Sequence, residues 1–332
     1  NVLNFFNGDG QGGGFPTARG ADTPRELQRQ KDKLVSAINA MDADIVTLME
    51  IENDGYGENS AIAELAEALG DDWSFVDPGL EQLGDDAIAV GILYRDGRVD
   101  TVGEAATLAS GAFSDRNRQP LAQTFWLSGE DEALTVIVNH FKSKGCREAE
   151  GVNADQGDGQ GCWNPLRTAA AEAIADWANN GPTDVEEADV LVTGDLNAYA
   201  KEDPIRALES AGMTDLVRQS SDDPAYSFVF RGESGTLDYA LANGALRDQV
   251  RTAHVWQSNA DEPRVLDYNT DFKTPMQVAD LFNTAPWRAS DHDPILVDLE
   301  LASAVPGDIN GDGRVTGRDL ALLIHALFRG KE

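Results

Sequence analysis

Short apolar runs alternate with polar loops along most of the chain, and most runs are bounded by Asp, Asn, Gly or Glu. Runs of this kind between turn-forming residues are typical of buried β-strands. We expect strands at 2–6, 44–49, 87–94, 121–126, 134–138, 189–193, 237–241 and 295–301. Pro294 precedes the last run, and it suits the start of an edge strand because proline cannot donate to a central ladder.

Four other segments have apolar residues at helical spacing, which predicts helices at 23–41, 60–69, 164–177 and 203–212. The first has a clear N-terminal signal: Thr23 is a preferred N-cap, Pro24 suits the first helical position, and Glu26 completes a capping box. Strands that alternate with helices, with returns of antiparallel type, predict an α/β sandwich rather than a doubly wound sheet.

The composition allows a full core, because 41% of the 332 residues are hydrophobic, and no apolar run approaches the length of a membrane span. The net charge is −32, from 58 acidic and 26 basic residues. This balance argues against a general polyanion-binding surface, since nucleic-acid-binding proteins normally carry a basic footprint. An anionic substrate would need local help from a few Arg and Lys side chains, or from metal ions held by carboxylates.

The chain begins at Asn1 with no initiator Met and no signal peptide, so we expect a processed or trimmed end. Cys146 and Cys162 share one Gly- and Asp-rich loop, without CxxC spacing and without an adjacent metal-type His. The predicted use is a disulfide that closes this loop, which indicates an oxidising extracellular or periplasmic setting. Two free thiols are the alternative.

Acidic and imidazole side chains occur where predicted strands meet loops: Glu50, His140, Asp195, Asp238 and His292. A carboxylate beside an imidazole, as at 291–292, can perform acid–base or metal chemistry. Taken alone, that stretch is better explained as a surface turn, and one His beside a strand as a core residue. Because the same kind of junction recurs, the sequence favours a catalytic site.

In chain order, these motifs resemble the DNase-I-like endonuclease/exonuclease/phosphatase superfamily: L-M-E-I-E-N at Glu50, N-H-F-K-S-K at His140, G-D-L-N-A at Asp195, L-D-Y at Asp238 and S-D-H-D-P at Asp291. Three more stretches are similar to the bacterial extracellular nuclease subgroup: R-G-A at Arg19, D-Q-G-D-G-Q-G-C-W-N at 155–164 and N-A-D-E-P at 259–263. The resemblance covers residues 1–301.

The resemblance implies an α/β (α+β) fold, a four-layer αββα sandwich of two packed mixed sheets flanked by helices, with the active site at one end. It also implies phosphodiester hydrolysis with a divalent metal, Mg²⁺ or Mn²⁺, both of which prefer hard oxygen ligands. Carried over by position, the metal ligands are Glu50, Asn1 and Asp291, with Asn4 as the alternative to Asn1.

The resemblance also implies the catalytic roles. Asp195 would orient or deprotonate the attacking water, and Asn197 would hold the phosphate or that water. His292, oriented by Asp238, would stabilise the transition state and assist proton transfer.

A second histidine and three cations complete the expected site. His140, oriented by Asp86, would act together with His292. Arg118, Lys142 and Lys144 are the expected phosphate contacts, and the two lysines follow His140 in a chain that is short of cations.

The tail resembles a different module. Position 7 of a calcium loop supplies its backbone carbonyl, and positions 1, 3, 5, 9 and 12 supply side-chain oxygens, which predicts the ligands Asp308, Asn310, Asp312, Arg314, Thr316 and Asp319. With an exiting helix at 320–328 and no entering helix, the segment resembles one dockerin-type repeat that binds Ca²⁺. A polar linker without calcium is the alternative. We expect a catalytic domain at 1–302, a linker at 303–306 and the repeat at 307–332, with a cohesin-type protein as a candidate partner.

These features predict a secreted, monomeric, metal-dependent nuclease that hydrolyses extracellular DNA, with RNA as a further candidate substrate and no membrane partner. The acidic surface predicts activity that is retained in salt. Two alternatives stay open: a sister phosphoesterase that acts on a nucleotide, an inositol phosphate or a phospholipid, and a non-catalytic binding protein. A plasmid-degradation assay separates the first, and the retained histidines and carboxylates argue against the second.

Overall fold

The structure is a computed structural model that describes residues 1–127, 133–185, 189–221, 225–301, 317 and 320. All six predicted calcium ligands and the predicted linker lie outside these described residues. No helix within the described residues is long and apolar enough to cross a membrane.

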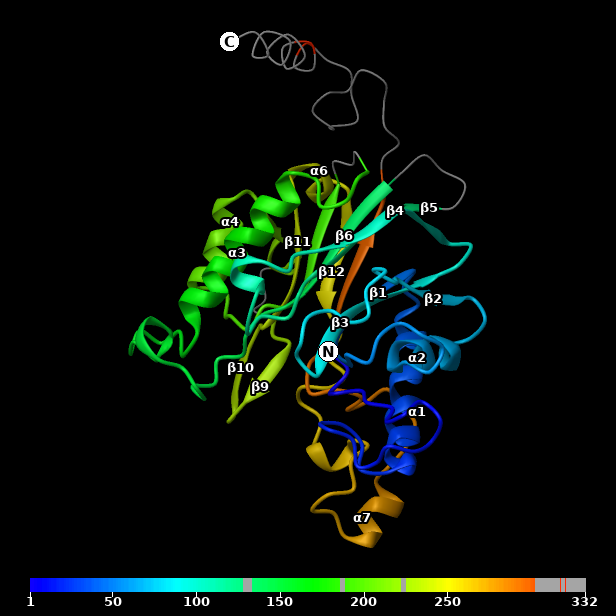
Figure 1. Cartoon of the computed structure of the whole chain (residues 1–332). Coiled ribbons are helices and arrows are strands. Elements are labelled where there is room, and N and C mark those ends of the chain that lie inside the picture. Colours follow the sequence, from blue (N-terminus) through cyan, green and yellow to red (C-terminus); the bar gives the residue numbers. More distant parts are fainter. Residues whose placement is uncertain (128–132, 186–188, 222–224, 302–316, 318–319, 321–332) are drawn as a thin grey trace.

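Helices and strands alternate along the chain (Figure 1). The helices are α1 (Pro24–Met41), α2 (Ala61–Leu69), α3 (Asn164–Asn179), α4 (Asp203–Ser210), α5 (Leu216–Ser220), α6 (Gly244–Arg247) and α7 (Pro275–Asp280). Short 3₁₀ helices occur at Gly111–Phe113, Gly151–Asn153 and Arg264–Leu266. The strands are β1 (Ile45–Glu52), β2 (Trp73–Phe75), β3 (Ile88–Arg95), β4 (Val99–Thr107), β5 (Leu121–Leu127), β6 (Ala133–His140), β7 (Val190–Asp195), β8 (Thr214–Asp215), β9 (Phe228–Phe230), β10 (Glu233–Gly235), β11 (Asp238–Ala242), β12 (Val250–Val255) and β13 (Ile295–Leu299).

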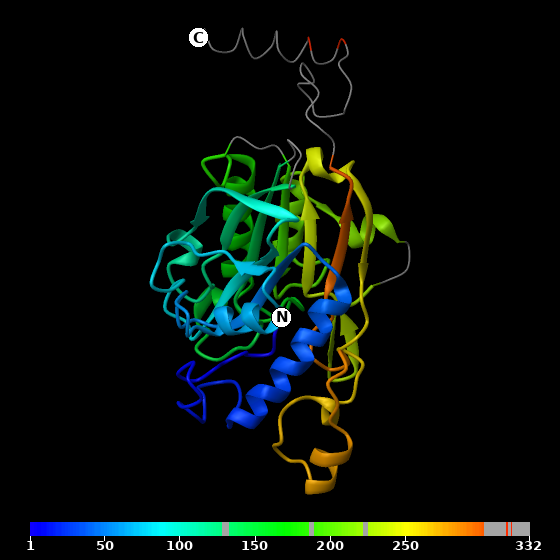
Figure 2. The ribbon, with the colours of Figure 1, turned by 90° about the vertical axis from the view of Figure 1, so that its right-hand side faces the viewer.

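The strands form two facing layers. One layer is a six-stranded sheet in the order β4-β5-β6-β7-β11-β8, in which β6 and β7 are parallel and the other neighbours antiparallel. The other layer contains the sheet β1-β3-β2 and the pair β12-β13. Helices α3 and α4 cover the first layer, and α1 and α2 cover the second (Figures 1 and 2). The mixed four-layer sandwich that the resemblance implies is therefore confirmed.

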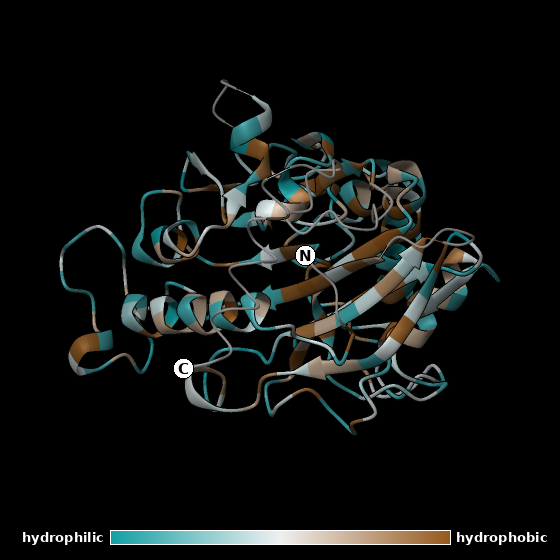
Figure 3. Cartoon of the chain, turned by 90° about the horizontal axis from the view of Figure 1, so that it is seen from above, coloured by the Kyte–Doolittle hydropathy of each residue, from teal (hydrophilic) through white to brown (hydrophobic). Residues whose placement is uncertain are grey.

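Strand alternation explains how the central sheet serves two cores. On β6, Val136 and Val138 join the apolar cluster between the two strand layers, whereas Ile137 joins the cluster under α3. On β7, Leu191 and Val192 divide in the same way. Successive side chains of a strand point to opposite faces, so an unbroken apolar run indicates a strand that is covered on both sides. Brown, the hydrophobic colour, accordingly concentrates on the long strands in the interior of the molecule (Figure 3).

The predicted strand at 2–6 is wrong as a continuous strand. Leu3 and Asn4 have φ angles of 54° and 50°, which interrupt the extended backbone. Within this segment, Phe5 alone pairs with a strand, through an isolated parallel bridge to Ile51. At the same place the pairing of β1 with β3 shifts register, and Glu50 takes a φ of 68°. This bulge re-aims the Glu50 side chain, and it brings the N-terminal segment to the carboxyl end of β1.

Helix α1 begins at the predicted place, since the Thr23 side chain accepts a hydrogen bond from the N–H of Glu26. The predicted capping box is wrong, because Glu26 does not reach back to the Thr23 backbone. Its carboxylate accepts hydrogen bonds from the N–H groups of Asp22 (2.8 Å) and Thr270 (2.7 Å). Glu26 thus ties α1 to a loop more than two hundred residues away.

Candidate active site

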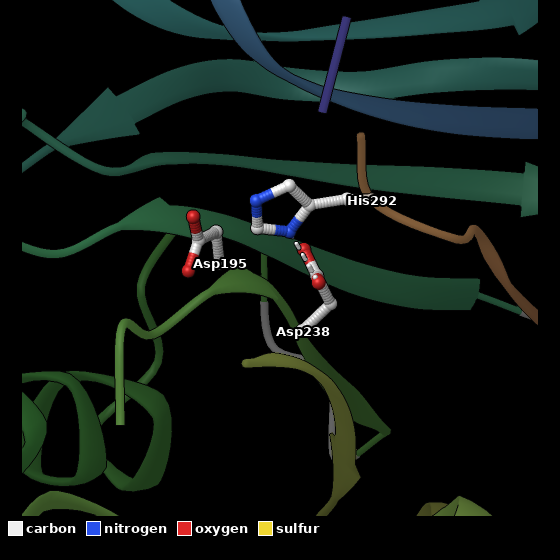
Figure 4. Close-up of side chains that lie close together, drawn as sticks. All are labelled: Asp195, Asp238 and His292. Carbon is white, nitrogen blue, oxygen red and sulfur yellow. Dashed lines mark hydrogen bonds and ion pairs between the residues drawn. The ribbon is translucent and has the colours of Figure 1, made fainter. Parts of the chain in front are cut away.

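Two carboxylates and an imidazole meet at one end of the six-stranded sheet. Asp195 ends β7, Asp238 begins β11, and the two are direct partners across this antiparallel pair. His292 comes from the loop before β13, and its ring lies between the two carboxylates (Figure 4). All three residues are buried, and one ligand-type atom from each lies within 4.8 Å of the others.

Asp238 orients His292. Nδ1 of His292 donates to Oδ2 of Asp238 at 2.7 Å, and the hydroxyl of Ser227 donates to the same oxygen at 2.7 Å. Burial disfavours the imidazolium, but the charge and hydrogen bond of Asp238, with help from Asp195, raise the pKa of His292 to about 10. Burial likewise disfavours the Asp238 carboxylate, yet the charge of His292 holds the pKa of Asp238 below its ordinary value. The pair is therefore an imidazolium held by a carboxylate.

Asp195 has the opposite electrostatics. Burial is the main reason that its pKa rises to about 7; the charge of His292 opposes this rise, and the carboxylates of Asp238 and Glu50 add to it. Its Oδ1 accepts a hydrogen bond from the N–H of Asn197 at 2.9 Å. A carboxyl group with a pKa near neutrality suits a general base.

His140 lies beside Asp195 through backbone register, because the two residues are partners across the parallel pair β6–β7. Gly194 permits this close pairing, since a Cβ there would lie 2.0 Å from the carbonyl oxygen of Asn139. Nε2 of His140 is 3.5 Å from Oδ2 of Asp195. Burial, then the nearby charges of Arg118 and His292, lower the pKa of His140 well below its ordinary value, so that this imidazole is neutral.

The predicted pairing of His140 with Asp86 is wrong. Nδ1 of His140 is buried and has no hydrogen-bond partner among the described residues. Asp86 instead forms ion pairs with Arg19 (2.8 Å) and Arg118 (3.0 Å). Two arginines offer a carboxylate more stabilisation than one neutral imidazole does.

Asn197 stands directly after β7 in a left-handed conformation, with a φ of 48°. Its amide nitrogen donates to the carbonyl oxygen of Phe141 at 3.0 Å, which fixes the direction of the side chain. The structure thus holds Asn197 against Asp195 and the backbone of Phe141, and its catalytic role stays a prediction.

The predicted metal ligands lie on three separate segments near this cluster. Glu50 is close enough to affect the pKa of Asp195, and Asp291 is close enough to affect that of His292. Oδ1 of Asn1 accepts a hydrogen bond from the N–H of Leu3 at 2.9 Å, and the N–H of Asn4 donates to Glu50.

These residues fit a divalent cation. The donors are hard carboxylate and amide oxygens, the kind that Mg²⁺ and Mn²⁺ prefer. Within the described residues, Asp195, Asp238 and His292 also form a group that could hold a metal. Oδ2 of Asp238 accepts hydrogen bonds from His292 and Ser227, as Oδ1 of Asn1 and a Glu50 oxygen accept from backbone N–H groups. The predicted metal ligands Glu50, Asn1 and Asp291 therefore stay a prediction.

Two of the three predicted phosphate contacts lie beside His140. The Arg118 side chain donates to the carboxylate of Asp86 and to the carbonyl oxygen of Phe141. Its backbone N–H donates to the backbone carbonyl oxygen of His140. Burial, and then the charge of Arg118, lower the pKa of Lys142. Two cations placed this close repel each other, so an anion between them would be stabilised.

Lys144 has a different role from the predicted phosphate contact. Its ammonium group pairs with Glu202, the residue before α4, and donates to the carbonyl oxygen of Gln160 at 2.7 Å. Lys144 therefore fastens the loop after β6 to the start of α4. Cys146 and Cys162 form a disulfide in the same loop.

Three residues that position the site were not among the predicted site residues. Arg167 on α3 is fully buried and donates to the carbonyl oxygens of Lys142, Cys162 and Gln160. Ser227 supports Asp238, as described above. The third, Asn259, was noted only within a sequence stretch, and its amide donates to the carbonyl oxygen of His292 at 2.8 Å.

Asp195 thus lies in the four-layer sandwich with a buried imidazole on either side, near the cations at the same end of the sheet. A sequence model of the Endonuclease/Exonuclease/phosphatase family matches residues 1–292, and the chain belongs to this family. No curated protein sequence matches the chain.

Solved structures share the fold. An endonuclease/exonuclease/phosphatase from Bacteroides vulgatus has a TM-score of 0.55 at 16% identity, covering 82% of this chain and 91% of that chain. D. rerio TDP2 in complex with a single-strand DNA product has a TM-score of 0.53 at 15% identity, covering 81% and 91%. A mannosyl-6-phosphatase from Bacteroides thetaiotaomicron has a TM-score of 0.54 at 14% identity, covering 82% and 91%.

Proposed function

We propose that the protein is a metal-dependent nuclease that hydrolyses phosphodiester bonds of DNA, with RNA as a further substrate to be tested. The observation that carries this proposal is the placement of Asp195, with a pKa raised to about 7, between a neutral His140 and a protonated His292. This arrangement sets a base, Asp195, beside an acid, His292, in one buried site.

In the proposed reaction, the Asp195 carboxylate takes a proton from the attacking water, and Asn197 fixes its position. His292 keeps Nδ1 on Asp238, so that Nε2 is the atom that donates to the phosphoryl or leaving oxygen. His140 donates a hydrogen bond or positions the phosphate from the other side. A divalent metal bound at Glu50, Asn1 and Asp291 would polarise the phosphoryl oxygen and offset its charge.

Two observations support nucleic acid as the substrate. Arg118 and Lys142 concentrate positive charge beside the site in a chain whose net charge is −32. Among proteins with the same fold, TDP2 is seen with a single-strand DNA product.

The disulfide between Cys146 and Cys162 supports secretion, because such bonds persist in oxidising compartments.

Hydrolysis of supercoiled plasmid, linear DNA, RNA and a phosphorylated sugar tests the proposal, each with Mg²⁺, with Mn²⁺ and with a chelator. We expect metal-dependent cleavage of DNA, and none by His292→Ala or Asp195→Asn in folded protein. Turnover of the phosphorylated sugar alone would replace this proposal with that of a sugar phosphatase.

The sequence of the tail supports a second, separate site for Ca²⁺ at 308–319. Deletion of residues 307–332 is expected to remove one bound Ca²⁺ and to leave DNA hydrolysis unchanged. Calorimetric titration with Ca²⁺, run beside the nuclease assay, checks both expectations. A truncated protein that stays folded but loses all activity would show that the tail belongs to the catalytic unit.

A further inference from the structure

An aromatic side chain with an open face lies next to the catalytic histidine. Phe230 is 53% exposed at the end of strand β9, although large apolar side chains in this chain are mostly buried. Its ring is stacked on that of Phe228, with centroids 6.3 Å apart and planes 13° apart. Phe228 in turn packs against the ring of His292, with centroids 4.6 Å apart. The three rings form a continuous row from the site to solvent.

The row is built on the catalytic residues themselves. Phe228 forms an antiparallel bridge with His292, and its neighbour Ser227 is hydrogen-bonded to Asp238. The backbone N–H of Asp293 donates to the carbonyl oxygen of Ser227 at 2.8 Å. Side chains at i and i+2 of a strand share one face, so Phe228 fixes where Phe230 lies. The position of Phe230 relative to His292 is therefore set by the fold.

A cation accompanies the exposed ring. The guanidinium carbon of Arg231 lies 5.1 Å from the ring centroid of Phe230, and Arg231 is exposed. No carboxylate in the described part of the chain is paired with Arg231. A π-face beside an exposed guanidinium matches the two parts of a nucleotide, since bases stack on aromatic rings and on Arg while phosphates pair with Arg.

We propose that Phe230 and Arg231 form a nucleotide subsite, in which the Phe230 ring stacks on a base that flanks the scissile phosphate and Arg231 pairs with the next phosphate. This inference rests on the proposed function, and it makes the base part of what the enzyme recognises. Stacking acts without regard to base identity, so the subsite selects nucleic acid over other phosphodiesters without reading sequence.

Two single-stranded oligonucleotides of equal length test the subsite. Each has one unprotected phosphodiester among phosphorothioates; in one the flanking nucleotides carry bases, and in the other they are abasic tetrahydrofuran residues. We expect the wild-type protein to have a KM about tenfold lower for the oligonucleotide with bases, with a similar kcat, because stacking is a binding contribution. Phe230→Leu should remove this difference, and Phe230→Tyr should keep it.

Trp126 provides a matched control. It is 47% exposed, and it lies on β5 opposite Ala133, at the other end of β6 from His140. Trp126→Leu should leave both KM values unchanged. The subsite is overturned if Phe230→Leu keeps the wild-type ratio of KM values. A wild-type protein that cleaves neither oligonucleotide nor plasmid DNA overturns the proposed function and, with it, the subsite.

Discussion

A single substitution in the His292–Asp238 pair should lower kcat strongly. Asp238→Asn keeps the shape but removes the charge that raises the pKa of His292 to about 10. We expect kcat to fall by about 10²- to 10⁴-fold, the usual effect of disabling one acid–base participant. The NMR titration of His292 should shift to lower pH in the same variant, and the chain has only four histidines to assign.

Ser227→Ala is the matched control for this prediction. It removes one hydrogen bond to Asp238 but keeps the carboxylate charge, so kcat should fall much less. Equal losses in the two variants would mean that Asp238 acts through packing rather than through its charge on His292.

At the residue scale, the sequence motifs placed Asp195 and Asp238 correctly at strand ends, because a carboxylate at the end of a buried strand needs a charged or metal partner. His292 lies in the loop before β13. Motifs do not reveal which carboxylate forms an ion pair with a given Lys or Arg side chain. Lys144 pairs with Glu202, a residue 58 positions away, and this choice depends on how α4 packs against the loop. The same limit applies to Asp86, whose arginine partners come from two distant segments.

At the element scale, the loop after β6 depends on one buried side chain. Arg167→Met keeps the volume of the side chain but removes three hydrogen bonds to loop carbonyls. We expect the free energy of unfolding to fall by about 1–3 kcal/mol for each buried carbonyl that stays unsatisfied, and KM to rise because Lys142 loses its support. Thermal unfolding and steady-state kinetics measure the two effects. Arg206→Met, an exposed site on α4, should change neither; a stable Arg167→Met protein with normal KM would contradict the prediction.

Element prediction succeeded where a run is buried on both faces, as in β6 and β7, since two packed cores require unbroken apolar residues. The strand prediction failed at residues 2–6, although this segment has the same kind of apolar residues. There the backbone of Leu3 and Asn4 is left-handed because the segment must follow the bulge at Glu50. A bulge belongs to the pairing of two strands, so neither strand's own pattern contains it.

At the scale of the whole molecule, buried ionisable groups set how stability depends on pH. The folded state raises the pKa of His292 to about 10, and burial raises those of Asp195 and Glu52 to about 7. The folded state therefore holds protons that the unfolded chain releases, between the ordinary carboxyl pKa and about pH 7 for Asp195 and Glu52, and between pH 6.5 and about pH 10 for His292. Stability falls as pH rises through both windows. His140 opposes this trend below pH 6.5, where the unfolded imidazole takes up a proton, and Lys33 opposes it above about pH 8.

We therefore expect Tm to decrease from pH 6.5 to pH 8 in the presence of a chelator. Glu52→Gln should weaken this dependence chiefly below about pH 7, because an amide has no proton to lose. Glu58→Gln replaces an exposed carboxylate in the following loop and should leave the dependence as it is. Differential scanning fluorimetry across this range suffices, and a Tm that rises with pH would refute the assignment of these groups.

The net charge of −32 leads to the last prediction, which concerns salt. A basic nuclease loses DNA affinity steeply as salt rises, because binding releases counterions into a more concentrated solution. Here the acidic surface repels DNA, and this repulsion is strongest in dilute buffer. At 1 M salt the Debye length is about 3 Å, so that only contact pairs such as those of Arg118 and Lys142 with phosphate still act.

Salt should thus relieve both the repulsion between protein and DNA and the repulsion among the carboxylates of the chain itself. We expect the initial rate at saturating Mg²⁺ to be retained or to increase from dilute buffer to 1 M NaCl, and we propose a source in saline water. Tm measured over the same salt series separates the two effects: a constant Tm with a falling KM assigns the gain to substrate binding. A rate that declines steadily from the lowest salt, as for a basic nuclease, would mean that the acidic surface serves solubility alone.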